Sequence, residues 1–295
     1  MQQAIQKASV LIEALPYMQN FRGKEVVVKL GGSAMDNEES LKTVMQDVVF
    51  MEIVGMRPIL VHGGGPAISA EMKRRGLTPK FVKGHRVTDA ETVKIVAEVL
   101  GNVINADIVR KIRDQGGRAK GVINEDRKTI RARKKLMRIT NEKGEAEEID
   151  LGFVGEPTSI DCGMLLDMCL DNVVPVVAPI GADADGNLLN LQADSLASFI
   201  AEQLRPEKIV FLTDTPGILT NPKDEGTLVS TLREDEVLQL IGRGVVDGGM
   251  LPKVQGCLDA LHAGVHKAHI VDGRVPHSLL LEIFTEKGIG TQIVS

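Results

Sequence analysis

Short runs rich in β-branched residues alternate along this chain with longer segments of helical spacing, and this alternation limits the fold more than any other feature. Strands are predicted at 25–30, 59–62, 173–180, 208–213 and 269–271. Helices are predicted at 40–54, 88–113, 190–204, 235–242 and 252–263. Because parallel strands need crossover helices, the alternation predicts an α/β fold with a largely parallel sheet.

Residues 1–24 precede the first predicted strand and are expected to form a separate unit. Apolar residues from Ile5 to Leu15 make a helix with no partner nearby in the sequence. This helix packs either on its own body or on another subunit. The dipeptide Arg205-Pro206 ends one predicted helix and introduces the next strand, so we expect two lobes, 25–205 and 206–295.

The composition excludes several classes of protein. Lys and Arg total 35 against 40 for Asp and Glu, and the chain has one Tyr, seven Phe and no Trp. This balance argues against nucleic-acid binding by charge or by base stacking. Three cysteines without a C-x-x-C pair indicate a reduced compartment. No signal-peptide pattern and no run of 18 apolar residues is present, so we expect a cytoplasmic protein that binds no membrane.

The segment 127–150 has a divided charge pattern. Seven basic residues fall in 127–138 and five acidic residues in 142–150. A basic tract of this kind can mark nucleic-acid or nuclear targeting. Two strands of opposite charge also suit a solvated β-hairpin with its turn at Lys143-Gly144, and we favour the hairpin.

Lys29 lies near the end of the first predicted strand, shortly before Gly31, Gly32 and a helix. Glycines at such a turn let backbone N–H groups approach an anion, and the N-terminus of the helix favours negative charge. A lysine there can place its ammonium group over the same anion. The junction resembles a phosphate-binding turn, although it has no Walker A pattern, and the alternative is a tight turn with Lys29 extended to solvent.

Three consecutive glycines, Gly63–Gly65, follow the second predicted strand. Such a run is costly in chain entropy, so a plain turn explains it poorly. A dinucleotide fingerprint would need glycine where the chain has Ile68, and an esterase oxyanion loop would need a G-x-S-x-G elbow, which is absent. The remaining interpretation is a second anion or carboxylate site built from backbone N–H groups.

Three charged residues stand near predicted helix starts. Arg86 precedes a helix for which Thr88 and Glu91 predict a capping box; its guanidinium either holds a carboxylate or makes a surface ion pair. Asp194 in a first turn suits the helix dipole by itself. Lys253 in a first turn opposes the dipole, which favours a nearby anion or carboxylate.

Together these motifs resemble the amino-acid kinase family, over nearly the whole chain from about Glu13. The matching segments are V-K-L-G-G-S-A, V-H-G-G-G-P, R-V-T-D, G-G-M-L-P-K, and H-I-V-D-G-R-V-P-H followed by L-L-L-E-I-F-T. Within the family the chain is most similar to the branch of arginine biosynthesis that phosphorylates N-acetyl-L-glutamate. The resemblance implies a three-layer αβα sandwich with an added N-terminal helix, and it implies ATP as phosphoryl donor with Mg²⁺ carried by the nucleotide.

The resemblance also implies roles for individual residues. Lys29 and Lys253 would neutralise the transferring phosphoryl group from opposite sides, and Asp194 would orient both lysines. The acetylglutamate, bound by the lobe 25–205, would be held by Gly64, Gly65, Arg86 and Asn190. The nucleotide, bound by the lobe 206–295 and by the first glycine turn, would be bordered by Gly31, Gly32, Thr213, Asp214 and Gly217. Gln192 stands where the family commonly has asparagine.

The two ends of the chain resemble the arginine-inhibited, hexameric branch of the family, through Tyr17, Glu282, Gly288 and Gly290. In that branch the N-terminal helix interlaces dimers, and arginine binds near the junction of this helix with the nucleotide lobe. Some members are also bound by the nitrogen-sensing PII protein. The resemblance therefore implies arginine inhibition and a homo-oligomer, either a dimer or a hexamer built as a trimer of dimers.

The chemistry of such a reaction agrees with these residues. A carboxylate acceptor is already anionic near neutral pH, so the site needs no general base but does need cations and backbone N–H groups. Two other functions stay open. One is a kinase for another N-protected amino acid of the α-aminoadipate type, and the other is a non-catalytic arginine sensor on the same fold. Retention of Lys29, Lys253 and Asp194 argues against the sensor.

Overall fold

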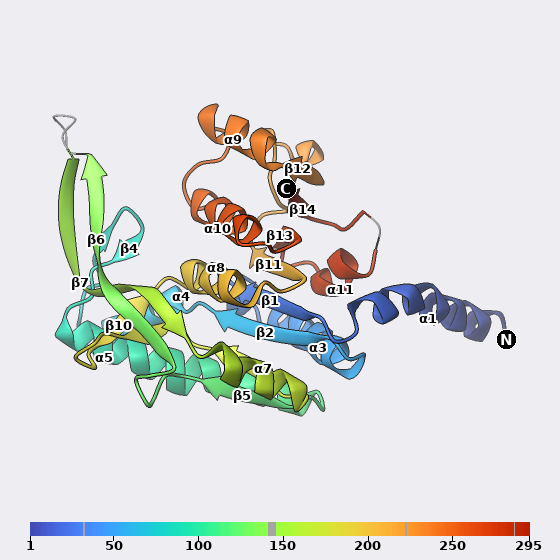
Figure 1. The fold of residues 1–295 in the computed structure, drawn as a ribbon, viewed down its shortest axis with the longest axis horizontal. Helices are drawn as coiled ribbons and strands as arrows, with labels where there is room; N and C mark the ends of the chain where they lie inside the picture. The colour runs from blue at the N-terminus through green and yellow to red at the C-terminus, as the bar shows by residue number, and fades with distance from the viewer. Residues whose placement is uncertain (32, 141–145, 222, 286) are drawn as a thin grey trace.

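A mostly parallel sheet forms the centre of the protein in the computed structural model, which describes residues 1–31, 33–140, 146–221, 223–285 and 287–295. The strands lie in the order β12-β14-β13-β11-β1-β2-β8-β5, and each described pairing except β13 with β14 is parallel (Figure 1). The predicted α/β fold is confirmed. The strand bounds are β1 Glu25–Leu30, β2 Arg57–His62, β5 Ala119–Val122, β8 Val174–Val177, β11 Lys208–Thr213, β12 Thr231–Arg233, β13 Lys267–Asp272 and β14 Thr291–Val294.

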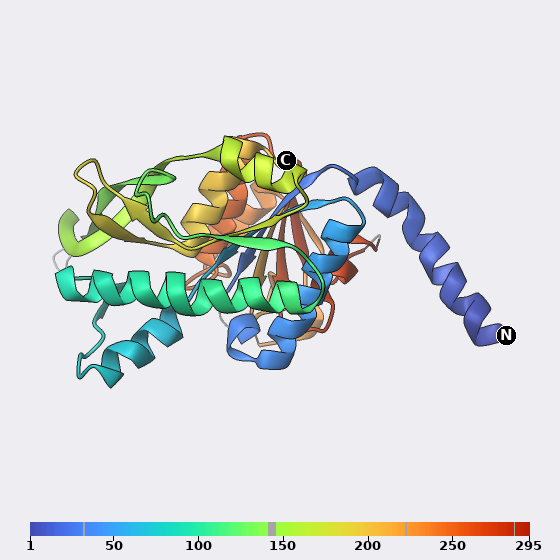
Figure 2. The same ribbon diagram turned by 90° about the horizontal axis from the view of Figure 1, so that it is seen from below.

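Helices cover both faces of this sheet and complete a three-layer αβα sandwich (Figure 2). Helices α7, α8 and α10 share one hydrophobic core with the sheet, whereas α3, α6 and α11 share another. Along β1, Val27 belongs to the first core and Val26 and Val28 to the second, as the two-residue period of a strand requires. The helix bounds are α3 Glu38–Ile53, α6 Ala106–Asp114, α7 Cys162–Leu170, α8 Ala193–Leu204, α10 Leu251–His262 and α11 Ser278–Ile283.

The strand predicted at 173–180 is divided in two. Strand β8 ends at Val177, and the chain then enters β9, Ile180–Ala182, which belongs to a different sheet. Pro179 lies between them and has no N–H to continue a ladder. By contrast, the strands predicted at 25–30 and 208–213 have the bounds that the sequence indicates.

The predicted capping box at Thr88 is wrong. Thr88 still belongs to an extended segment, because its N–H donates to Leu151 O and its carbonyl accepts from Phe153 N. The helix α5, Ala90–Glu98, is capped one residue later by Asp89, whose carboxylate accepts from the N–H of Thr92 at 2.8 Å. The predicted helix 88–113 then continues through a π-helical segment, Val99–Asn105, into α6.

The charged segment 127–150 contributes a long antiparallel hairpin, as predicted. Strands β6, Ile130–Thr140, and β7, Ala146–Ile160, pair antiparallel, with register shifts between Arg131 and Ala132 and between Lys134 and Leu136. Side chains of opposite charge meet across the hairpin, as in the 2.7 Å ion pair of Lys134 with Asp150. The predicted turn at Lys143-Gly144 lies outside the described residues. With β9 and β10, Leu188–Leu191, the hairpin strands close a small barrel beside the main sheet.

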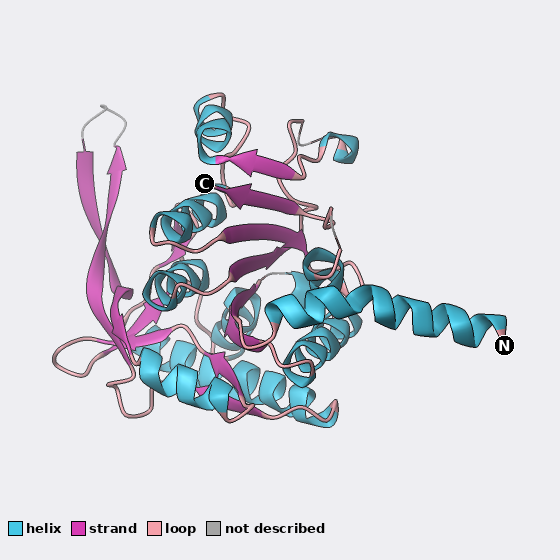
Figure 3. Ribbon diagram, turned by 45° about the vertical axis from the view of Figure 1, so that its right-hand side comes forward, coloured by secondary structure: helices cyan, strands magenta, loops and turns pink. Residues whose placement is uncertain are grey.

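Helix α1, Gln2–Phe21, projects from the body (Figures 1 and 3). Its last turns pack on the body through Tyr17 and Phe21, which both meet Phe284 edge to face with ring centroids 6.4 Å apart. Its earlier turns expose apolar side chains, with Leu11 62% and Ile12 67% exposed. Among the described residues, no helix combines the length and apolar character needed to cross a membrane.

The predicted lobe boundary at Arg205-Pro206 falls in the turn between α8 and β11. Arg205 ends α8 with a left-handed backbone, φ 49°. The division of the chain into lobes at this turn stays a prediction. The remaining elements are α2 Ser33–Asp36, α4 Gly65–Arg74, β3 Phe81–Val82, β4 His85–Arg86, a 3-10 turn Glu225–Thr227 and α9 Glu234–Gly242.

Candidate active site

The candidate site lies at the carboxyl ends of the central parallel strands. Strand β1 pairs with β2 on one side and with β11 on the other, so the order of the sheet reverses at β1. In open α/β sheets, the crevice beyond the strand ends at such a reversal is where ligands bind. Both predicted glycine turns, after β1 and after β2, are at this crevice.

Asp194 connects two lysines from different elements. Lys29 Nζ lies 2.8 Å from Asp194 Oδ1 in an ion pair, and Lys253 Nζ donates to Asp194 Oδ2 at 3.4 Å. Lys29 is on β1, Asp194 in the first turn of α8 and Lys253 in the first turn of α10. The three side chains are 8%, 15% and 17% exposed, so Lys29 does not extend to solvent.

The packing of α8 on α10 brings these residues together. Gly256 follows Lys253 by three residues and Ser198 follows Asp194 by four, one helical turn in each case. A Cβ at Gly256 would lie 2.3 Å from Ser198 Oγ, so glycine allows the two helices to approach closely at this point. The sequence analysis did not select Gly256, although an isolated glycine inside a helical pattern is a signal for such a contact.

The Lys29–Asp194–Lys253 cluster carries a net positive charge. Burial acts to raise the pKa of Asp194, but the two ammonium groups outweigh it and hold that pKa below its usual value. Asp194 is therefore ionised near neutral pH and cancels one of the two positive charges. The remaining positive charge favours an anion in the crevice. Lys253 is unfavourable beside the positive end of the helix dipole, and the neighbouring Asp194 carboxylate compensates for this.

Gly31 leaves room for the ammonium group of Lys29. A Cβ at this position would lie 2.2 Å from Lys29 Nζ and 3.0 Å from the carbonyl oxygen of Leu212. A residue with a side chain would therefore clash at this turn, which explains the glycine. The neighbouring predicted residue, Gly32, lies outside the described residues.

The glycine run after β2 is braced from two neighbouring elements. Gly63 N donates to the carbonyl of Leu30 at the end of β1, at 3.0 Å, and Arg86 Nη2 donates to the carbonyl of Gly65 at 2.9 Å. Among the described residues, nothing accepts from the N–H groups of Gly64 and Gly65, which open α4. These two groups can therefore receive an anion.

One cavity of about 190 Å³ collects the four residues predicted to hold a carboxylate substrate: Gly64, Gly65, Arg86 and Asn190. Arg86 is buried, and burial lowers its pKa, but a guanidinium stays charged at neutral pH. It donates to Ser69 Oγ at 2.8 Å and lies 4.7 Å from the Phe81 ring centroid. No carboxylate among the described residues pairs with it, so the surface ion pair considered above is wrong.

Asn190 lies on β10 rather than at the start of a helix, which corrects the predicted start at 190. Its amide donates to Thr88 Oγ1 at 3.2 Å, so the buried Thr88 helps to hold Asn190 in this wall. Helix α8 starts at Ala193 with Gln192 as its N-cap residue, although the Gln192 side chain makes no capping hydrogen bond. A second, larger cavity has a volume of about 700 Å³. Gly63–Gly65 line both this cavity and the smaller one.

Thr213 ends β11, which pairs with β1, and Asp214 and Gly217 lie on the loop that follows. Thr213 is buried and donates to the Asp214 carboxylate at 3.2 Å, whereas Asp214 is exposed. Gly217 has φ +146°, and a Cβ there would lie 2.5 Å from Thr291 Oγ1. This glycine allows the loop to pack closely against β14.

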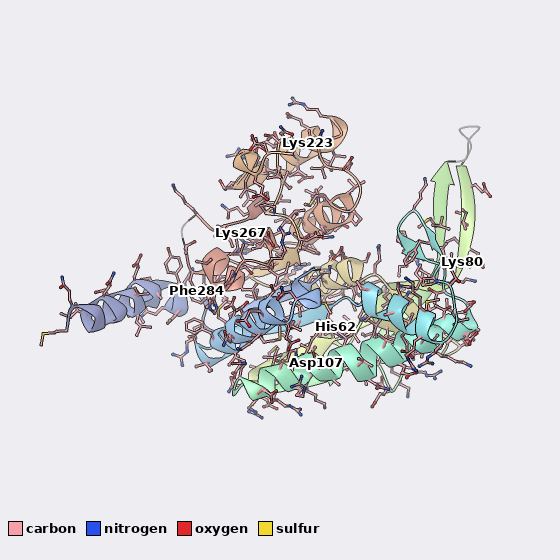
Figure 4. The ribbon with its side chains drawn as sticks, turned by 180° about the vertical axis from the view of Figure 1, so that it is seen from behind. His62, Lys80, Asp107, Lys223, Lys267 and Phe284 are labelled. Carbon is pink, nitrogen blue, oxygen red and sulfur yellow. The ribbon has the colours of Figure 1, made fainter. Side chains whose placement is uncertain are left out.

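The residues predicted for regulation gather at a second place, where α1 meets the body near Phe284 (Figure 4). Glu282 is buried; its carboxylate contacts His269 Nδ1 at 2.6 Å and accepts from the N–H groups of Ile289 and Gly290. Burial acts to raise the pKa of Glu282, but the contact with His269 and the two N–H groups hold it below its usual value. A Cβ at Gly288 would lie 2.5 Å from this carboxylate.

The sequence analysis missed two members of this cluster. His269 lies on β13, and Lys208, the first residue of β11, is buried with its ammonium 5.0 Å from the Phe21 ring centroid. Burial, with Lys267 as a lesser cause, lowers the pKa of Lys208 to about 8. The sequence signal for Lys208 was a charged residue at the start of an otherwise apolar, buried strand.

In the part of the chain that the structure describes, no group of three or more His, Cys, Asp or Glu side chains is arranged to hold a metal ion. Asp194, the acidic residue at the centre of the site, is occupied by two lysines.

The Amino acid kinase family model matches residues 24–272, and the chain belongs to this family. It is 48% identical to acetylglutamate kinase of Methanothermobacter thermautotrophicus, over 97% of this chain and 98% of that protein. It is 45% identical to acetylglutamate kinase of Heliobacterium modesticaldum, over 100% of both. The protein is therefore an enzyme of the kinase class.

A solved structure of N-acetylglutamate synthase from Neisseria gonorrhoeae, complexed with coenzyme A and N-acetyl-glutamate, has a similar fold. The TM-score is 0.82 at 25% identity, over 98% of this chain. The chain spans 63% of the length of that synthase.

Gly31→Ala should lower turnover. The added Cβ would lie 2.2 Å from the Lys29 ammonium and 3.0 Å from the Leu212 carbonyl oxygen, so the ammonium has to move and loses its contact with Asp194. We expect kcat to fall about tenfold to a hundredfold, together with a lower melting temperature, because a buried ion pair is broken. Gly242→Ala, whose Cβ meets no atom within 4 Å, is the matched control. Equal kcat in the two variants would contradict this account of Gly31.

Proposed function

We propose that this protein transfers the γ-phosphoryl group of ATP to the side-chain carboxylate of N-acetyl-L-glutamate, in arginine biosynthesis. The observation that carries the proposal is the small cavity lined by Gly64, Gly65 and Arg86. Among the described residues, Arg86 has no carboxylate partner, and the N–H groups of Gly64 and Gly65 have no acceptor. These groups suit a small dicarboxylate. Relatives at 45% and 48% identity, named acetylglutamate kinase, support the same substrate.

The dicarboxylate would bind with its two ends at different groups. Arg86 and the Asn190 amide would hold the α-carboxylate and acetamido end, because a guanidinium and an amide supply several N–H donors. The N–H groups of Gly64 and Gly65 would hold the side-chain carboxylate. The glycine run adjoins the end of β1 through the hydrogen bond of Gly63 with Leu30, so this carboxylate would face Lys29.

In the transfer, a side-chain carboxylate oxygen attacks the γ-phosphorus of ATP, the bond from this phosphorus to the β-phosphate oxygen breaks, and ADP leaves. The product is an acyl phosphate. The attacking group is already anionic, so no proton has to be removed and no base is required. The protein's task is to bring two anions together in line and to cancel their repulsion.

Lys29 and Lys253 would supply this cancellation. Asp194 holds both ammonium groups at one place before substrates bind, which reduces the reorganisation that the transition state would otherwise require. Mg²⁺ carried by the nucleotide would add charge neutralisation on the phosphate oxygens. The segment from Thr213 to Gly217, in which Asp214 is exposed, would border the nucleotide.

The test is ADP release with magnesium-ATP in the presence of hydroxylamine, which traps an acyl phosphate as a hydroxamate. N-acetyl-L-glutamate, free L-glutamate, L-aspartate and N-acetyl-α-aminoadipate are compared. We expect turnover and hydroxamate with N-acetyl-L-glutamate only. Preference for N-acetyl-α-aminoadipate would overturn the substrate but not the reaction. Inactivity with every acid would favour a non-catalytic arginine sensor.

Lys29→Ala and Lys253→Ala should each lower kcat about a hundredfold or more, with a smaller effect on the KM for acetylglutamate, because the lysines act on the transferring group. Lys42→Ala, an exposed lysine of α3, is the control and should keep full activity. Unchanged kcat in either lysine variant would remove that residue from the mechanism.

We also propose that arginine inhibits the enzyme at the junction of α1 with the body. Tyr17 packs on Phe284, which follows the buried Glu282 by two residues. An effector bound at the Glu282 carboxylate would therefore change how α1 packs on the body. The exposed apolar turns of α1 suit contact with another subunit, in a dimer or a hexamer of three dimers, and a PII protein is a further possible partner.

Deletion of residues 1–20 should leave kcat near that of the full chain but abolish both arginine inhibition and the larger oligomer. Light scattering gives the mass, and arginine titration of the ADP-release assay gives the inhibition. Glu282→Gln in the full chain separates the two effects, since it should weaken inhibition while the oligomer persists. Retention of inhibition and mass by the truncated chain would contradict the role of α1.

A further inference from the structure

The orientation of one peptide group in the glycine run is controlled by a buried histidine. The carbonyl oxygen of Gly63 lies 2.9 Å from His62 Nδ1. A carbonyl oxygen only accepts, so Nδ1 carries the proton and donates. In a trans peptide, the N–H of the next residue points away from this carbonyl. The His62 bond therefore fixes the direction in which the N–H of Gly64 points.

His62 is itself held by Asn105. Its other ring nitrogen, Nε2, lies 3.1 Å from Asn105 Nδ2, and the same amide nitrogen donates to the carbonyl of Val176 at 2.8 Å. With Nδ1 protonated, Nε2 of a neutral ring is an acceptor, so both amide hydrogens of Asn105 are used and the tautomer of His62 is determined. His62 is 0% and Asn105 2% exposed.

The π-helical segment Val99–Asn105 braces the same peptide from the other side. A Cβ at Gly64 would lie 2.5 Å from Ile104 and 2.6 Å from Leu100, so both side chains press on this glycine. Gly121 makes room for Asn105, since a Cβ there would lie 2.2 Å from Asn105 Oδ1. Interruptions of this kind in α-helices are frequent at functional sites.

We propose that His62 and Asn105 are positioning residues, which hold the Gly63–Gly64 peptide so that the Gly64 N–H, and not a carbonyl oxygen, is presented to the acceptor carboxylate. This proposal rests on the proposed function for the identity of the acceptor. Rotation of the peptide would place a partial negative charge where the anion binds and remove a donor. Gly64 lines the acceptor cavity, and its N–H has no acceptor among the described residues.

The ring charge of His62 agrees with this arrangement. Burial lowers the pKa of His62 to about 4. The ring thus stays neutral at physiological pH, and Nε2 remains free to accept from Asn105. A protonated ring would place two donors opposite each other at Nε2 and Asn105 Nδ2.

Two substitutions of His62 separate positioning from packing. An asparagine amide nitrogen can occupy the place of Nδ1 and donate to Gly63 O, whereas a glutamine amide reaches toward Nε2 and meets Asn105 instead. We expect His62→Asn to keep kcat within about tenfold of the unchanged enzyme and His62→Gln to lose about a hundredfold, at similar melting temperatures. Equal losses in both variants, or a larger loss in His62→Asn, would overturn the proposal.

A second measurement does not depend on substrate or variants. Nitrogen-15 NMR of the histidine rings in the unchanged protein should show His62 protonated at Nδ1 and not at Nε2, without titration between about pH 5.5 and 8. A proton at Nε2 would overturn the proposal even if the enzyme is active. If N-acetyl-L-glutamate is not a substrate but the Nδ1 proton is found, the proposed function fails and the positioning of the peptide stands.

Discussion

The ion pairs of Asp194 with Lys29 and Lys253 are the interaction on which the rest of this structure depends. Two ammonium groups repel each other, and they stay together near the end of β1 because a carboxylate lies between them. Three separate elements must meet for this to happen. The alternation along β1 turns Lys29 toward the α8 and α10 layer, and Gly256 lets these two helices approach.

The parallel sheet explains why cationic and backbone donors occur at one edge. Carboxyl ends of adjacent parallel strands meet there, and each is followed by a turn into a helix N-terminus, whose N–H groups favour anions. Gly31 after β1 and Gly63–Gly65 after β2 allow the close approach that these turns need. A reaction between two anions requires both features, cations on the phosphoryl side and N–H groups on the carboxylate side.

Local signals predicted much of this arrangement. The apolar runs at 25–30 and 208–213 predicted two central strands with the correct bounds. The two glycine turns and Lys253, a lysine in a first helical turn, indicated three parts of the candidate site. Contacts between distant elements were not predictable in the same way. Asn190 reaches Thr88 across 102 residues, and His62 reaches Asn105 across 43. Neither pairing follows from periodicity or from turn chemistry, because both depend on the tertiary packing of strands and helices.

The start of α5 illustrates the same limit on a smaller scale. Thr88 and Glu91 have the spacing of a capping box. However, backbone hydrogen bonds with Leu151 and Phe153 keep Thr88 extended, and Asp89 is the N-cap residue instead. Helix-start chemistry is a weak preference of about 1 kcal/mol, and tertiary hydrogen bonds override it. In this position the Thr88 hydroxyl donates to the carbonyl of Arg86 and accepts from the amide of Asn190.

A double-mutant cycle in kcat/KM between Asp194→Asn and Lys253→Ala tests the central claim most directly. If Asp194 acts by holding the lysines in place, the two residues work as a unit and their effects are not additive. The account predicts that the double variant loses less activity than the product of the two single losses, because part of the Asp194 effect acts through Lys253 and the rest through Lys29. Losses that multiply would show that Asp194 and Lys253 act independently and would contradict the account.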